Sequence, residues 1–131
     1  MAVLRRFFDH LAPGGVVVLD IHPLSFLAGG GEDRRQWTAE NGDLLTLEGV
    51  RTRIDWIGQR SEARLRYERW RDNRLVEAQL EPMAQRFWGL DEFALALAAA
   101  GFTGVQACGG YERGRSVRPG DRVMTFEATR P

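Results

Sequence analysis

Three polar side chains near the ends of predicted strands could bind a substrate or take part in proton transfer. They are His22, Arg86 and Tyr111. His22 comes directly after an apolar, β-branched run, Val16 to Ile21. Open α/β sheets bind ligands outside the carboxyl ends of their strands, and histidine titrates near neutral pH. His22 is therefore a candidate for substrate binding and for catalysis. The alternative is a loop histidine that caps backbone or faces water, which is the commoner situation.

Arg86 and Tyr111 also allow two interpretations each. Tyr111 lies just past a predicted strand, where it would either line a substrate pocket or pack against an edge strand, and we favour packing. Arg86 would either bind a substrate carboxylate or phosphate through its guanidinium or form a structural ion pair with Glu81 or Asp91.

A glycine run and a set of tryptophans are further candidates. Gly29-Gly30-Gly31 follows no clear strand, and the EDRRQW after it opens no convincing helix, so we favour a flexible or ligand-covering loop over a phosphate site. The tryptophans would either roof a pocket for a flat substrate or pack in the core or at an interface. They are Trp37, Trp56, Trp70 and Trp88.

Composition narrows the class of protein. The chain has 131 residues, a length that suits one domain. Its 18 basic residues balance 18 acidic ones, and this zero net charge argues against a nucleic-acid or anionic-membrane partner. A single cysteine, Cys108, excludes an internal disulfide, and no apolar run is long enough to span a membrane, so we expect a cytoplasmic protein. With only His10, His22 and Cys108 as soft ligands, the sequence predicts no metal site.

The first elements predicted to position these side chains are a helix and a strand. Apolar residues between Val3 and Leu11 recur on one face of a helix, and Pro13-Gly14-Gly15 ends it. The continuous run Val16–Ile21 then predicts a strand covered on both faces, as in a parallel sheet.

An antiparallel meander is predicted over residues 36–87, where the hydrophobic period becomes two. Asn41-Gly42 predicts a hairpin with a type I′ turn. EARLRYERW and LVEAQLE form a second hairpin around RDNR, with Arg–Glu pairs that we expect to be solvated.

The helical period returns after the meander. Asp91 and Glu92 suit the first turn of a helix, and Gly101 suits its C-terminal cap. TGVQACGGY and DRVMTFEATR then predict two strands joined by a polar loop from Glu112 to Gly120. The predicted order is thus helix, buried strand, antiparallel meander, helix and two strands, an α/β arrangement.

Three segments resemble a known family. FFDHLAPGGVVVLDI resembles the region before and through the fifth strand of class I S-adenosylmethionine-dependent methyltransferases, where a helix ends in Leu-x-Pro-Gly-Gly. RFWGLDEFALALAAAGFTGVQACGGY resembles their late Arg-aromatic pair, helix and strand, and VMTFEATRP resembles their last strand. The meander resembles the antiparallel insert that some small-molecule methyltransferases, including sugar N-methyltransferases, carry over the substrate site.

The resemblance implies the C-terminal half of such an enzyme, which is a partial Rossmann-like α/β fold, as one domain over residues 1–131 with the insert at 36–87. The family's cofactor is S-adenosylmethionine, but the sequence has no Gly-x-Gly-x-Gly after a strand and lacks the N-terminal cofactor-binding strands. No cofactor-binding residue is carried over, and we do not expect this chain alone to bind the methyl donor.

Two kinds of function follow. The chain is either the substrate-side portion of a small-molecule methyltransferase, inactive or partner-dependent alone, or a non-enzymatic dimeric binding or scaffold protein. A remnant that folds but does nothing is a third reading. Because bare apolar strand edges are avoided, we expect the free edge of Val16–Ile21 to be covered by a second copy or by a complementing N-terminal half chain.

Overall fold

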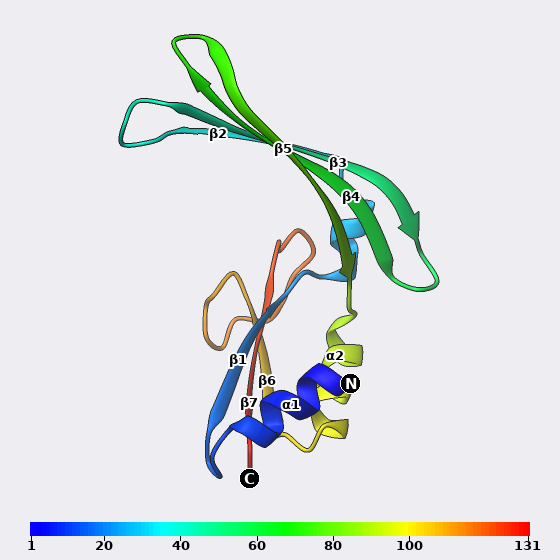
Figure 1. The fold of residues 1–131 in the computed structure, drawn as a ribbon. Helices are drawn as coiled ribbons and strands as arrows, with labels where there is room; N and C mark the ends of the chain where they lie inside the picture. The colour runs from blue at the N-terminus through cyan, green and yellow to red at the C-terminus, as the bar shows by residue number, and fades with distance from the viewer. The chain divides into compact units, whose positions relative to one another are not determined.

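The computed structural model describes residues 1–131, and the chain divides into two compact units. The first unit joins Met1–Phe26 to Phe87–Pro131, and the second comprises Leu27–Arg86. Figure 1 labels the helices and strands of both. Neither α-helix is long and apolar enough to cross a membrane.

The first unit is a mixed α/β structure built on a three-stranded antiparallel sheet of order β1-β7-β6. The predicted order of elements is confirmed. Because β1 and β6 both run antiparallel to β7, their carboxyl ends lie at the same edge of the sheet. The bounds are α1 Ala2–His10, β1 Val16–Ile21, η1 Leu24–Ala28, α2 Leu90–Ala99, β6 Thr103–Gly109 and β7 Met124–Thr129.

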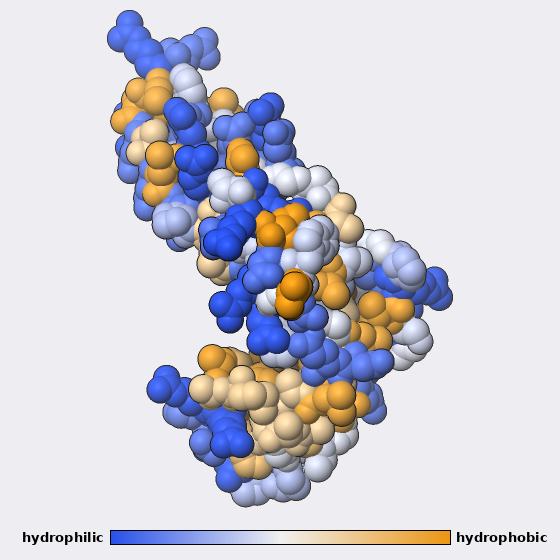
Figure 2. All heavy atoms as spheres, turned by 90° about the vertical axis from the view of Figure 1, so that its right-hand side faces the viewer, coloured by the Kyte–Doolittle hydropathy of each residue, from blue (hydrophilic) through white to orange (hydrophobic).

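Both helices pack against one face of this sheet. Leu4 of α1 and Phe93 and Leu97 of α2 are buried in one cluster with Phe126 and Ala128 of β7. Helix α2 also carries an apolar residue on the side that faces away from the sheet, where Leu95 is 70% exposed. Figure 2 shows this helical side, in the lower part of the picture, as a broad apolar surface. We name the opposite, helix-free side of the sheet the outer face.

Strand β1 has the predicted bounds, but the prediction that both of its faces are covered is wrong for this chain. Val17, Leu19 and Ile21 pack on the core, whereas Val16 and Val18 on the outer face are 47% and 61% exposed. One edge of β1 pairs with β7, and its other edge pairs with no strand of this chain. A run of β-branched residues fixes a strand, but it does not say which elements cover it.

The second unit is a four-stranded antiparallel sheet of order β2-β3-β4-β5. The predicted meander is confirmed, although its first strand begins at Glu32 rather than near Gln36. Charged residues alternate with apolar ones along its strands, and the strand pairs carry exposed ion pairs such as Arg34–Glu48 at 2.9 Å. The bounds are β2 Glu32–Thr38, β3 Leu44–Asp55, β4 Arg60–Arg71 and β5 Arg74–Arg86.

The second hairpin turns at RDNR as predicted, but the first turn of this sheet differs from the prediction. Asn41-Gly42 lies in the predicted hairpin, but only Gly42 has a positive φ, so the turn is not type I′. The loop spans residues 39–43, and its backbone closes through the Ala39 amide and the Asp43 carbonyl at 2.9 Å. Two successive positive φ angles occur instead at Asp72 and Asn73, between β4 and β5.

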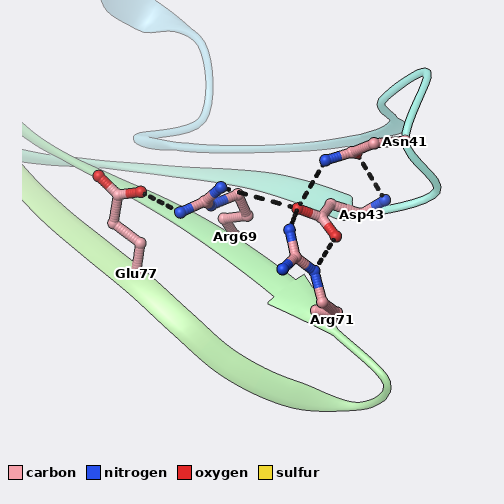
Figure 3. Close-up of polar contacts among 5 residues, drawn as sticks. All are labelled: Asn41, Asp43, Arg69, Arg71 and Glu77. Carbon is pink, nitrogen blue, oxygen red and sulfur yellow. Dashed lines mark hydrogen bonds and ion pairs between the residues drawn. The ribbon is translucent and has the colours of Figure 1, made fainter.

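A buried carboxylate fixes this loop. Asp43 is 2% exposed and accepts two hydrogen bonds from Arg71, at 2.8 and 2.9 Å. Asn41 donates to it at 3.1 Å, and Arg69 lies 3.8 Å away and pairs in turn with Glu77 (Figure 3). Hydrogen bonds from Arg71 hold the pKa of Asp43 below its ordinary value, against the opposing effect of burial.

The chain leaves and re-enters the first unit at adjacent positions. Pro23 and Trp88 form a parallel bridge, and the Leu24 amide donates to the Trp88 carbonyl at 3.1 Å. The rings of Phe26 and Phe87 stack with their centroids 5.9 Å apart. Leu27–Arg86 is therefore an insertion whose flanking residues are in contact.

Candidate functional site

His22 lies immediately after β1, at the carboxyl edge of the three-stranded sheet, and is exposed. Its ring stacks on Phe26, with centroids 4.9 Å apart, and its Nδ1 lies 3.0 Å from the Arg122 carbonyl oxygen. A carbonyl oxygen only accepts, so Nδ1 carries the proton in this hydrogen bond. The neutral imidazole then presents Nε2 as a proton acceptor, held in one orientation by the stacking.

Tyr111 lies two residues after β6, at the same edge of the sheet as His22. It is 68% exposed, so the predicted packing role is wrong. The Asp20 carboxylate, on the outer face near the end of β1, is the charge that affects its phenol. Asp20 accepts a hydrogen bond from Thr125 of β7 at 2.7 Å.

The loop backbone places Tyr111 in this position. Tyr111 has φ +62°, a left-handed conformation that costs a non-glycine residue on the order of 1 kcal/mol, and Gly110 before it has φ +60°. The guanidinium of Arg115 lies against Gly109 and Gly110 and forms an ion pair with Asp121 at 2.8 Å. A Cβ on Gly110 would overlap that guanidinium. The Arg115–Asp121 pair therefore packs over the turn that presents Tyr111.

Charge assigns different chemistry to the two side chains. The negative charge of the Asp20 carboxylate raises the pKa of the Tyr111 phenol above its ordinary value, and burial adds to the effect. The phenol therefore stays protonated at neutral pH and acts as a hydrogen-bond donor rather than a base. Of the two, His22 is the group placed to accept a proton.

Arg86, Trp37, Trp56 and Trp70 belong to the second unit, whereas Trp88 belongs to the first. Arg86 is the last residue of β5 in the second unit, opposite Arg60 of β4. Trp37 and Trp70 lie on opposite faces of the four-stranded sheet, because Trp37 is aligned with Leu45 and Trp70 with the adjacent Leu44. Trp37 and Trp70 therefore do not cover the same face of the four-stranded sheet.

Asp20 is the residue that the sequence analysis missed. It is the one charged residue inside the apolar run Val16–Ile21. A lone carboxylate in such a strand is a usable signal, since an apolar residue would serve a structural role better. Its hydrogen-bond partner Thr125 is far along the chain, so sequence spacing gave no means of pairing them.

Gly29–Gly31 does not have the surroundings of a phosphate-binding loop. Gly29–Gly31 lies between the short η1 helix and β2, so no strand and helix flank it as a phosphate-binding loop requires. A Cβ on Gly30 would meet no atom within 4 Å, so no close approach requires that glycine. The prediction that this segment is not a phosphate site agrees with its place in the fold.

Sequence comparison finds no matching family model and no matching curated protein. Solved structures match with low sequence identity but extensive structural overlap. A S-adenosylmethionine-dependent methyltransferase from Clostridium acetobutylicum is 14% identical with a TM-score of 0.73, and the match covers 96% of this chain and 48% of that one.

Two further structures come from Streptomyces. The CcbJ methyltransferase from Streptomyces caelestis is 18% identical with a TM-score of 0.65, over 98% of this chain and 51% of that one. DesVI from Streptomyces venezuelae is 19% identical with a TM-score of 0.68, and the match covers 99% of this chain and 50% of that one. The chain spans about half the length of each of these solved structures. It therefore has a partial class I methyltransferase fold.

Proposed function

We propose that this chain is the substrate-side, C-terminal portion of a S-adenosylmethionine-dependent small-molecule methyltransferase and that it acts with a complementing N-terminal half. The observation that carries the proposal is the near-complete overlap of this chain with only about half of each solved methyltransferase structure. The unpaired edge of β1 supports it, because an apolar strand edge is a ready site for another strand.

The role of this portion is to orient the acceptor molecule and to receive its proton. An acceptor amine or hydroxyl bound at the carboxyl edge of β1 would place its proton within reach of Nε2 of His22. Stacking on Phe26 and the hydrogen bond to the Arg122 carbonyl keep that nitrogen in one orientation. Tyr111 would contribute a phenolic donor and an exposed ring at the same edge.

The test is calorimetric titration with S-adenosylmethionine and S-adenosylhomocysteine. The chain is titrated alone and after co-purification with an N-terminal methyltransferase half chain that carries a glycine-rich loop. We expect no binding by the chain alone and binding by the complex. Micromolar binding by the chain alone, or a complex that neither forms nor binds, contradicts the proposal.

The role of His22 is tested by transfer of labelled methyl groups to small-molecule amines and alcohols. His22→Ala in the complex should reduce transfer about hundredfold, the scale of one general base. His10→Ala is the matched control, because His10 is an exposed histidine of α1 whose Nδ1 also bonds a backbone carbonyl, that of Arg6 at 2.7 Å. Equal losses in the two variants would contradict the assignment.

A non-enzymatic dimeric binding protein is the second candidate, and the setting of Gly29–Gly31, which is not flanked by the strand and helix of a phosphate-binding loop, favours it. It predicts saturable binding of small molecules by a homodimer of this chain, with no affinity for the methyl donor in any complex. Analytical ultracentrifugation and the same titrations separate the two candidates.

A further inference from the structure

We propose that the free edge of β5 is the interface of a homodimer, in which the β5 strands of two copies pair antiparallel about a two-fold axis at Ala78. One edge of β5 pairs with β4, and its other edge pairs with no strand of this chain. The strand has 13 residues, and every residue from Arg74 to Pro82 is exposed. A long, exposed strand edge is a template for another strand. This interface lies in the second unit and goes beyond the proposed function.

The opposite edge of the four-stranded sheet has a different composition. Strand β2 has 7 residues, and it begins with four charged ones, Glu32 to Arg35. A short edge strand rich in charge disfavours pairing with another strand. Strand β5 carries instead the apolar residues Leu75, Val76 and Leu80, which are 43%, 47% and 71% exposed. Of the two edges of this sheet, β5 is therefore the one suited to pairing.

Pro82 indicates which backbone groups of β5 face outwards and where the free edge ends. Proline has no N–H group, and it is accommodated in an edge strand with its nitrogen facing away from the neighbouring strand. Backbone groups along an antiparallel strand point alternately to its two edges. The backbone groups of Leu80 and Ala78, two and four residues before Pro82, therefore face outwards as well. Pairing with a second copy ends at Pro82, because this residue offers no donor.

A two-fold axis at Ala78 brings apolar side chains together. Val76 is an extra residue in β5, since Leu75 and Glu77 are aligned with the adjacent positions 70 and 69 of β4. Because of this bulge, Leu75 and Leu80 stand at equal steps from Ala78. Both lie on the same face of the sheet, since they are aligned with positions 70 and 66 of β4. Leu80 of one copy then packs against Leu75 of the other, and the axis repeats this contact.

The same axis brings opposite charges together. Arg74 of one copy meets Glu81 of the other, one step beyond the leucines on each side of the axis. Both residues lie on the other face of the sheet, aligned with positions 71 and 65 of β4. The ion pair that joins β4 to β5 uses different residues, Arg69 and Glu77 at 2.9 Å. The exposed side chains of Arg74 and Glu81 are thus available to a second copy.

The experiment measures the mass of the purified chain by sedimentation equilibrium over a range of concentrations, and we expect a dimer. Arg74→Glu and Glu81→Arg each place like charges opposite one another twice in the dimer. Each variant alone should dimerise about tenfold more weakly, from two lost attractions and two new repulsions. An equimolar mixture of the two variants should associate as the wild type does, because each supplies the charges that the other lacks. This recovery also verifies that both variants are folded.

Arg34→Glu is the matched control, because Arg34 is an exposed arginine on β2, at the opposite edge of the same sheet. It should leave dimerisation unchanged. A monomeric wild type, a dimer that neither β5 substitution weakens, or a mixture that does not recover would overturn the interface. Equal losses in Arg34→Glu and Arg74→Glu would do the same.

The outcome is independent of the proposed methyl transfer, since no methyl donor and no second kind of polypeptide is added. Pairing through β5 leaves the free edge of β1, in the first unit, for a complementing half chain. A dimer of this kind is therefore compatible with both candidate functions, and the titrations with S-adenosylmethionine separate them. A failed interface would leave those titrations valid.

Discussion

Replacing Leu97 by alanine should unfold the first unit at markedly lower denaturant concentration. Leu97 lies on α2, is 0% exposed and belongs to the core cluster that joins both helices to β7. The substitution removes buried methyl and methylene groups worth about 0.8 kcal/mol each, and the residual cavity adds to the cost. We therefore expect a loss of about 3 kcal/mol in the free energy of unfolding.

Urea titration followed by circular dichroism measures this loss. With a slope of about 2 kcal/mol/M, the midpoint should fall by about 1.5 M. Leu95→Ala is the matched control, because Leu95 lies two residues away on the same helix and is 70% exposed. It should cost about 0.5 kcal/mol or less. Similar midpoints for the two variants would refute the packing of α2 described above.

Three further substitutions test the charges and the backbone. Asp43→Asn should lower stability at neutral pH. Because the pKa of Asp43 is lowered in the folded chain, its contribution to the free energy of unfolding is fully present above the pKa of an unfolded aspartate, about 3.9. That contribution is lost as the pH falls through the pKa of Asp43 in the folded chain. Urea titrations should therefore show the stabilities of the wild type and the variant converging in acid. Gly101→Ala should lower the melting temperature more than Gly14→Ala, because both glycines have positive φ but only a Cβ on Gly101 would contact another side chain closely. Asp20→Asn should lower the pKa of Tyr111 towards its ordinary value, as measured by ultraviolet titration in a chain whose other tyrosine is replaced by phenylalanine.

Local signals predicted most of the elements correctly. The helix 90–99 has acidic residues in its first turn and Gly101 after its last, and both signals depend on backbone groups within a few residues. The bounds of Val16–Ile21 followed from β-branched composition alone. In each case the deciding interactions are close in the sequence.

The predictions that failed depend on distant residues. The turn at Asn41-Gly42 is set by Asp43, whose arginine partners come from β4, and not by the preference of the dipeptide. The covering of β1 depends on other elements of the fold, and the turn that leaves Tyr111 exposed is packed by the later residues Arg115 and Asp121. A hydrophobic period describes one segment, and it carries no information on which remote group will meet that segment.

The contact between the residues flanking the insertion makes the second unit exchangeable. Since Pro23 and Trp88 are bridged and Phe26 stacks on Phe87, a short linker could close the gap without moving either end. A lineage could therefore lose, lengthen or swap the four-stranded sheet while the helices and three-stranded sheet stayed intact. The same junction offers a grafting point, at which a different recognition module is spliced onto an unchanged α/β platform.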